Sequence, residues 1–240
     1  MILGDIHAFW TAGQELLASV QRGVPRYRCW GLLFCAAAAV RLGRFDEAEL
    51  LLQQEADIQD LERALLERVS RCATQALLDA RRGRWDAVVE RFDGCAADLD
   101  AIKPMILEFI YLMPRLLDAL GLALAALPPS DPRRPRLLAR HRWTVRWLKT
   151  SGRTYKVASI YAAVYGGLEA ALQRKPSAHK LLSAALEQAE ACQMRYVAAA
   201  ACGALAQLLP LQADAYTARA RALLAHASPQ DPVPPWPLAL

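Results

Sequence analysis

Apolar residues recur at helical spacing along nearly the whole chain. Recurrence every three or four residues predicts amphipathic helices, and no window alternates apolar and polar positions as a strand of β-branched residues does. One predicted helix begins near Asp46, and the others span about residues 5–20, 26–42, 61–82, 85–99, 104–127, 134–150, 155–173, 177–193, 195–209 and 211–227. The pattern predicts an all-α fold.

Two of the predicted joints between helices have nearly the same sequence. The segment Arg41-Leu-Gly-Arg-Phe-Asp-Glu-Ala48 returns forty residues later as Arg81-Arg-Gly-Arg-Trp-Asp-Ala-Val88. The glycine suits the left-handed residue that ends many helices, and Asp46 stands where an N-cap residue belongs. An internal period of this length is typical of stacked helical hairpins.

Prolines mark the remaining breaks. Pro114 lies inside the predicted helix 104–127 and should kink it or split it in two. The proline-rich stretch 128–135 predicts a loop between hairpins, or a boundary between subdomains. We therefore expect a single helical domain over 1–227. Five of the thirteen residues from 228 to 240 are proline, which predicts an extended or flexible tail.

Two apolar stretches raise the question of a membrane span. Residues 29–40 are too few to cross a bilayer, which takes about 20. Residues 104–127 are enough, but they include Glu108, Arg115 and Asp118, which favour a buried core helix. The N-terminus has no basic stretch followed by an apolar run, so no signal peptide is predicted. We expect a cytoplasmic protein that does not enter the membrane.

The six cysteines stand at positions 29, 35, 72, 95, 192 and 202, without any Cys-x-x-Cys pair. All lie in apolar, helix-like surroundings, where cysteine acts as a small hydrophobic residue. A disulfide framework is not expected in a chain of this size with these spacings. The prediction is six reduced thiols.

Charge is distributed unevenly, although the net charge is only +5. Residues 44–100 contain 14 acidic and eight basic side chains, whereas residues 132–168 contain nine basic side chains and no acidic one. At 100° per residue, Leu137, His141, Val145 and Leu148 share an inward face of the basic helix. A predicted binding surface comprises the basic stripe and its neighbouring tryptophans: Arg136, Arg140, Arg142, Trp143, Arg146, Trp147, Lys149 and Arg153.

Three interpretations of this basic surface stay open. It can be a solvated outer face whose arginines keep an apolar helix soluble. It can bind an acidic protein surface, including the acidic region 57–67 of the same molecule or of a second copy. Nucleic acid, held through residues 136–156, ranks behind both because the tryptophans and arginines are its only supporting signal.

No group of residues predicts catalysis. The four histidines stand far apart, without a second ligand at metal-binding spacing on the same helix. There is no Gly-x-Ser-x-Gly elbow and no Gly-x-x-x-x-Gly-Lys-Ser/Thr loop. The segment 151–156 lacks the spacing of a glycine-rich phosphate loop and is interpreted as a polar helix joint. We expect a protein that is not an enzyme and that uses no metal or cofactor.

The two glycine joints resemble those of tetratricopeptide repeats. Each has an aromatic residue two positions after the glycine (Phe45 or Trp85) and a small or short apolar residue three further on. Seven residues before each glycine stands Ala36 or Ala76, where close helix approach needs a small side chain. The resemblance implies a right-handed superhelix of stacked antiparallel helical hairpins, a tetratricopeptide-like α-solenoid.

Residues 169–224 also resemble the C-terminal MalT-like helical region of bacterial signalling proteins that carry an ATPase or kinase module. The similar segments are the alanine- and leucine-rich hairpin through 180–187, then 191–197 and 198–209. This resemblance implies that the chain is the sensor or scaffold part of such a protein.

The sequence thus predicts a non-catalytic scaffold that binds a protein, a peptide or a second copy of itself. Stacked hairpins form a long groove lined by side chains of successive helices. Candidate lining residues are polar or amphipathic side chains on the predicted inner helices: Arg28, Arg68, Gln75, Tyr111, Tyr161 and Tyr165. The alternative is a sensor domain that binds a small effector within the superhelix.

Overall fold

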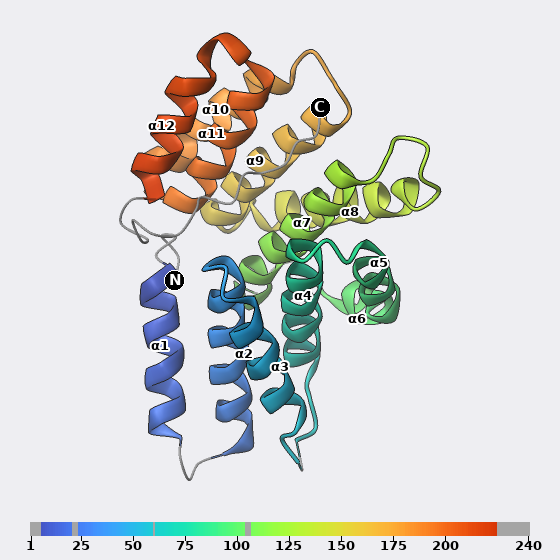
Figure 1. The fold of residues 1–240 in the computed structure, drawn as a ribbon, viewed down its shortest axis with the longest axis vertical. Coiled ribbons are helices and arrows are strands. Elements are labelled where there is room, and N and C mark those ends of the chain that lie inside the picture. Colours follow the sequence, from blue (N-terminus) through green and yellow to red (C-terminus); the bar gives the residue numbers. More distant parts are fainter. Residues whose placement is uncertain (1–5, 21–23, 60, 104–106, 225–240) are drawn as a thin grey trace. The chain divides into compact units, whose positions relative to one another are not determined.

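A computed structural model describes residues 6–20, 24–59, 61–103 and 107–224. Over these residues the chain forms α-helices, one short 3-10 helix and no strand, which confirms the all-α prediction (Figure 1). The helices are α1 (Ile6–Ser19), α2 (Pro25–Arg41), α3 (Phe45–Ala56), α4 (Leu65–Arg81), α5 (Trp85–Gly94), α6 (Ala96–Ala101), α7 (Leu107–Ala126), α8 (Arg134–Ser151), α9 (Lys156–Leu172), α10 (Ala178–Ala191), α11 (Arg195–Leu208), the 3-10 helix Pro210–Gln212, and α12 (Ala213–Leu224).

The helices belong to two compact units, with the division between Lys103 and Pro104. The first unit holds α1 to α6 and the second holds α7 to α12. The loop 128–135, considered above as a possible subdivision, lies within the second unit. The predicted proline-rich tail 228–240 lies outside the described residues.

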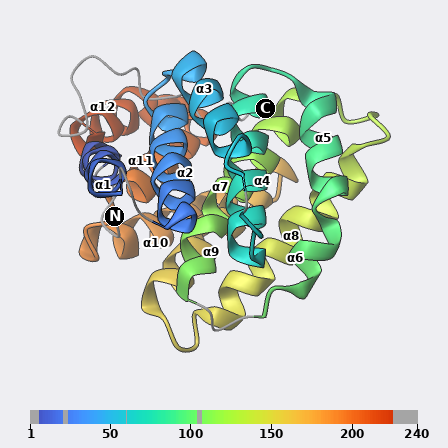
Figure 2. The same cartoon turned by 90° about the horizontal axis from the view of Figure 1, so that it is seen from below.

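In the first unit, α2 is the central helix and contacts α1, α3 and α4. Helices α1 to α4 run alternately down and up in Figure 1, and Figure 2 shows α2 between α1 and α4. Ala36 in α2 and Ala76 in α4 are fully buried. The two alanines that the repeat places seven positions before each glycine are thus both core residues.

In the second unit, each helix from α7 to α12 packs on the next one along the chain. In addition α9 contacts both α7 and α11, so these three alternate helices lie together. Helix α7 supplies most of the bulky core side chains: Ile110, Met113, Leu116, Leu117, Leu120 and Leu124. The arrangement buries an apolar face that no single hairpin could bury alone.

Helices α2 and α4 end in the same hydrogen-bonded motif. Gly43 and Gly83 have positive φ angles of 76° and 71°. The amide of Arg44 donates to the carbonyl of Ala39 at 2.9 Å, and the amide of Gly43 donates to Val40 at 3.3 Å. This pair of bonds is the Schellman motif, which satisfies carbonyls that the helix end leaves free. The predicted left-handed role of Gly43 is confirmed.

Two further joints use the same motif without glycine. Arg174 and Gln193, after α9 and α10, have φ angles of 54° and 56°. The amide of Lys175 donates to Ala170 at 2.9 Å, and that of Met194 donates to Ala189 at 2.8 Å. The sequence does not indicate these two left-handed positions, because both carry side chains that rarely adopt this conformation.

The start of the third helix differs from the prediction. Helix α3 begins at Phe45, its N-cap position is Arg44, and no side chain caps it. Asp46 therefore lies in the first turn rather than at the cap. Its carboxylate accepts a hydrogen bond from Arg82, so it joins the two glycine joints through an exposed ion pair.

The predicted helices 61–82 and 85–99 are also shorter or broken. Helix α4 begins at Leu65, because Arg63 reaches back and donates to the Glu55 carboxylate at 2.7 Å, which holds the preceding segment outside the helix. The second helix is interrupted at Cys95, directly after Gly94, whose helix propensity is low. It becomes α5 and α6.

Helix α7 continues through Pro114 and is not split. A proline inside a helix costs about 3 kcal/mol, and here nearly every neighbouring position of α7 is buried, so packing outweighs that cost. The helix is long and apolar enough to cross a bilayer, but 89% of its apolar window is buried within the protein. A core helix passes the same test of length and composition.

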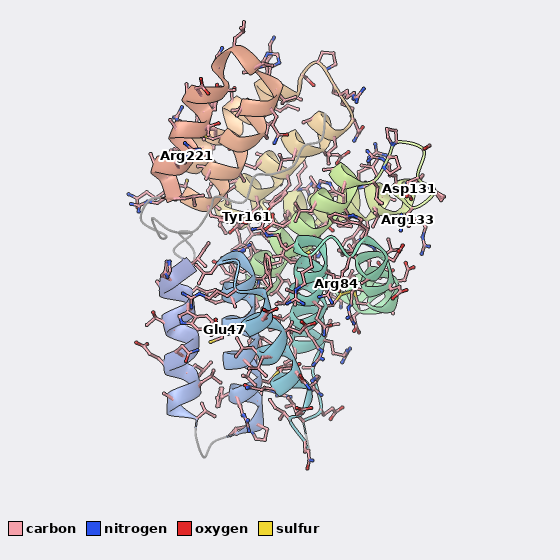
Figure 3. All side chains as sticks on the ribbon, viewed as in Figure 1. Glu47, Arg84, Asp131, Arg133, Tyr161 and Arg221 are labelled. Atoms are coloured by element: carbon pink, nitrogen blue, oxygen red, sulfur yellow. A yellow bond between two sulfur atoms is a disulfide. The ribbon has the colours of Figure 1, made fainter. Side chains whose placement is uncertain are left out.

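The proline-rich loop between α7 and α8 is held by arginines. Arg133 binds the Asp131 carboxylate through its side chain at 2.7 Å and through its amide at 2.9 Å, and Figure 3 labels both residues. These hydrogen bonds hold the pKa of Asp131 down at about 2. Arg134 donates to the carbonyls of Leu124 and Leu127 at the end of α7. The loop is thus tied to both helices that it joins.

The prediction of six reduced thiols is wrong for two of them. Cys72 in α4 and Cys95 between α5 and α6 are joined as a disulfide, with their Cα atoms 6.7 Å apart. Helical packing brings these two cysteines together, although they are 23 residues apart in sequence. That spacing alone does not indicate that they pair. Cys29, Cys35, Cys192 and Cys202 are free.

Candidate functional site

The predicted basic surface lies on α8, which orients its residues as the helical period requires. Leu137, His141 and Leu148 are buried on the inward face, and Val145 is half-buried. Arg136, Arg142, Arg146 and Lys149 are exposed, and Arg153 is exposed just after the helix ends.

The two tryptophans of this surface have different environments. Trp143 is half-buried, and the Arg140 guanidinium lies over its ring at 5.3 Å from the centroid. This is a cation–π contact between two residues of the predicted surface. Trp147 departs from the prediction, because only 4% of its surface is exposed and it belongs to the core. It cannot present its ring to a partner without unpacking the helix.

Glu169 in α9 neutralises part of the basic surface. Its carboxylate accepts from Arg142 Nε at 2.9 Å and from Gln173 Nε2 at 2.6 Å, and it lies 3.8 Å from His141 Nδ1. Burial raises the pKa of Glu169, but the nearby His141 and the hydrogen bonds from Arg142 and Gln173 outweigh it and lower the pKa to about 2. Arg142 is therefore occupied by an internal partner.

Four exposed cations remain near the joint of α8 and α9, and we call them the cationic ridge: Arg146, Lys149, Arg153 and Lys156. Arg146 donates to the backbone carbonyl of Arg142 at 3.3 Å. Among the residues that the structure describes, no carboxylate pairs with any of the four. The ridge, rather than the whole predicted stripe, carries the positive charge that a partner could meet.

The predicted groove residues fall into both units. Arg28 is exposed on α2, while Arg68 and Gln75 lie on α4. Arg68 binds Asp98 through two hydrogen bonds of 2.9 and 2.7 Å, which lower the pKa of Asp98. Arg68 is thus held within its own unit. Tyr111, Tyr161 and Tyr165 lie on α7 and α9 of the second unit.

The structure brings Tyr161 and Tyr165 together with residues that sequence reasoning missed. Tyr165 is buried, and its hydroxyl donates to Asp118 Oδ1 at 2.5 Å, while the hydroxyl of Tyr196 is 3.5 Å from Asp118 Oδ2. The rings of Tyr161 and Tyr165 are 6.5 Å apart between centroids. We call Asp118, Tyr161, Tyr165 and Tyr196 the tyrosine cluster. Figure 3 labels Tyr161 on its helix.

The tyrosine cluster joins the three alternate helices α7, α9 and α11. Asp118 anchors it from a buried position, whereas Tyr161 and Tyr196 are half-buried and keep part of each ring accessible. Tyr111 stands seven residues before Asp118, on the same face of α7, and burial raises the pKa of its hydroxyl. One available signal was Asp118 itself, one of three charged residues in a predominantly apolar helix.

In the part of the chain that the structure describes, no group of three His, Cys, Asp or Glu side chains could hold a metal ion. Two features reach the surface of the second unit, the tyrosine cluster and the cationic ridge. No protein-family model, no curated protein and no solved structure matches this chain. The function is therefore argued from the geometry of these two surfaces.

Proposed function

We propose that this protein is a non-catalytic helical-repeat scaffold that binds a protein or peptide partner. In this proposal its hairpins stack as a right-handed, tetratricopeptide-like superhelix, and it serves as the regulatory part of a bacterial signalling protein. The observation that supports the proposal best is the contact of α9 with both α7 and α11, joined by the tyrosine cluster. Repeats that stack in this way create a continuous surface of alternate helices.

The chemistry of that surface favours a polypeptide partner. Tyrosine is enriched at protein interfaces because it offers a large rigid ring and a polar hydroxyl. Tyr161 and Tyr196 have this combination, and the buried hydrogen bonds of Asp118 fix their surroundings before any partner arrives. A preorganised surface loses little conformational entropy on binding.

A capture experiment with matched variants tests the proposal. The purified chain is crosslinked to proteins of a bacterial extract, and captured proteins are compared between wild type, Tyr161→Ala and Tyr27→Ala. Tyr27 is an exposed tyrosine on α2 in the other unit and serves as the control. We expect a specific protein that Tyr161→Ala loses and Tyr27→Ala retains. A capture profile identical in all three proteins would contradict the proposal.

The cationic ridge supports a second candidate, an acidic surface or nucleic acid as partner. Its four cations are exposed, and none pairs with a carboxylate among the described residues. Binding to nucleic acid should weaken steeply as salt rises, because each phosphate contact releases a counterion. Fluorescence anisotropy with a labelled oligonucleotide measures this slope, and Lys149→Ala with Arg153→Ala should flatten it. Salt-independent binding, or no binding, would exclude nucleic acid.

A third candidate is a sensor for a small effector, bound near the tyrosine cluster. In that region the half-buried Tyr196 contacts the buried Asp118, and the half-buried Tyr161 lies beside Tyr165. A ligand that binds only the folded protein raises the melting temperature in a concentration-dependent way. A thermal-shift screen of small metabolites distinguishes this candidate from the scaffold, which needs no small ligand.

A further inference from the structure

The cysteine pair of the first unit lies at the open end of a helical hairpin. Helices α4 and α5 are joined by the turn at Gly83, and Cys72 precedes this glycine by eleven residues while Cys95 follows it by twelve. Two positions at nearly equal distances from the turn face each other across an antiparallel hairpin. Their Cα separation of 6.7 Å lies within the range of protein disulfides. The disulfide therefore closes the hairpin at the end opposite its turn.

The equivalent position of the preceding repeat carries a buried carboxylate instead. Forty residues before Cys95 stands Glu55, fully buried at the end of α3. Its carboxylate accepts from Arg63 at 2.7 Å and from Arg71. These ion pairs join α3 to α4 and to the segment before it, so corresponding positions of the two repeats hold different kinds of crosslink. The disulfide responds to a reductant, and the ion pairs of Glu55 do not.

Helices α5 and α6 depend on α4 for their place in the first unit. Within that unit α5 packs on α4 and α6, and α6 packs on α4 and α5. They bury Val88, Phe92 and Leu99 there. Few other contacts of the unit hold this segment, so its local opening should cost less free energy than unfolding of the whole unit. A covalent bond from α4 to the joint between α5 and α6 has a large effect on such a segment.

Among the buried cysteines, Cys72 and Cys95 are the most accessible to small reagents. Cys72 and Cys95 each keep 7% of their surface exposed, whereas Cys29, Cys35 and Cys202 have none. Burial raises the pKa of Cys29 to about 12 and the pKa values of Cys35 and Cys202 to about 11, which keeps these three as unreactive thiols. Cys192 is half-buried and far from the pair in sequence.

The surroundings also accommodate the reduced form. The carbonyl of Arg91 lies 3.6 Å from Cys72 Sγ, and the carbonyl of Phe92 lies 3.8 Å from Cys95 Sγ. Each reduced thiol can donate a weak S–H hydrogen bond to one of these carbonyls. Neither redox form leaves a sulfur without a compatible neighbour.

We propose that Cys72 and Cys95 form a reversible disulfide, exchanged with small thiols and disulfides, that locks α5 and α6 onto α4 and releases them on reduction. This inference stands apart from the proposed scaffold function. In the oxidising direction, one cysteine thiolate attacks a small disulfide and displaces one thiolate. The second cysteine then attacks the protein sulfur of the mixed disulfide and displaces the other. Together the two protein thiols lose two electrons and two protons, and the small disulfide becomes two thiols.

Intact mass spectrometry tests the exchange on the full chain. The protein is equilibrated with varied ratios of glutathione to glutathione disulfide, and free thiols are alkylated under denaturing conditions. We expect one pair of thiols to convert between the free and bonded states. Cys72→Ser and Cys95→Ser should each abolish the conversion, and Cys192→Ser should leave it unchanged. A pair that stays reduced in glutathione disulfide alone overturns the proposal.

Hydrogen exchange of the wild-type protein tests the consequence without any substitution. Amides of α5 and α6 should exchange at least ~10-fold faster in the reduced form. Amides of α3, which Glu55 joins to Arg63 and to Arg71 of α4, should exchange equally in both forms and provide the internal control. Equal protection of α5 and α6 in both forms would mean that the bond is a static crosslink, and the switch would be refuted.

Discussion

Gln193 occupies the same position in its helix joint as Gly83 does in an earlier one. Both have positive φ, 56° for Gln193 and 71° for Gly83, and both are followed by an amide that donates to the carbonyl five residues back. A side chain in this conformation places its Cβ close to the following carbonyl, at a cost of about 1–2 kcal/mol. The joint after α10 therefore contains strain that the joint after α4 avoids.

Replacing Gln193 by glycine should stabilise the second unit by about 1 kcal/mol. Urea unfolding, followed by circular dichroism, measures the change in the free energy of unfolding. Gln188→Gly, at an exposed position inside α10, is the matched control and should destabilise by about 1 kcal/mol. If both substitutions destabilise equally, the left-handed position of Gln193 is not strained.

Removing the buried carboxylate of Glu55 should destabilise the first unit strongly. Arg63 and Arg71 both bind it, and Cys29 lies 3.4 Å from its Oε1. Breaking a buried ion pair by removing one partner leaves a charge without compensation, so Glu55→Gln should cost about 3 kcal/mol. Urea unfolding measures this loss.

The exposed carboxylate of Glu49 provides the comparison for Glu55. It pairs with Arg82 at 2.6 Å, but about half of its side chain is exposed to solvent. Solvent screens such pairs, so Glu49→Gln should change the free energy of unfolding by no more than ~0.5 kcal/mol. Equal losses for the two substitutions would show that burial of Glu55 adds nothing to the strength of its pairing.

The fold was largely predictable because its local signals are strong. Helical periodicity located most helices, and Gly43 and Gly83 marked two joints correctly. Arg174 and Gln193 could not be recognised, because the surrounding packing rather than local preference imposes their left-handed conformation. The break at Cys95 and the late start of α4 likewise depend on contacts between helices, such as that of Arg63 with Glu55.

The candidate site was predictable only within single helices. The inward face of α8 follows from its period, which explains the burial of His141. The partners that change the interpretation come from other helices. Glu169 follows the basic segment by one residue and yet pairs with Arg142, 27 positions earlier, and Asp118 meets Tyr196 across 78 positions. Periodicity carries no information about which helices pack together.

The low pKa of Glu169 predicts a specific loss of stability in acid. Its folded pKa is about 2, against 4.5 for the ordinary carboxyl group. A depressed pKa stabilises the folded state above the unfolded value, and this contribution disappears as the pH falls from about 4.5 towards 2. The free energy of unfolding should therefore fall more steeply over this range in wild type than in Glu169→Gln. Parallel pH profiles in urea unfolding would contradict the assignment.

Tyr165→Phe tests whether Asp118 depends on the tyrosine hydroxyl. The substitution keeps the buried ring and removes the donor that lies 2.5 Å from the carboxylate. A hydrogen bond to a buried charged group contributes about 1.5–3 kcal/mol, so the second unit should lose roughly 2 kcal/mol of stability. Tyr196→Phe removes a longer contact of 3.5 Å from a half-buried residue and should cost less than half as much. Because both variants retain their aromatic rings, a larger effect for Tyr196→Phe would mean that Asp118 is held mainly from α11, and the role assigned to Tyr165 would be wrong.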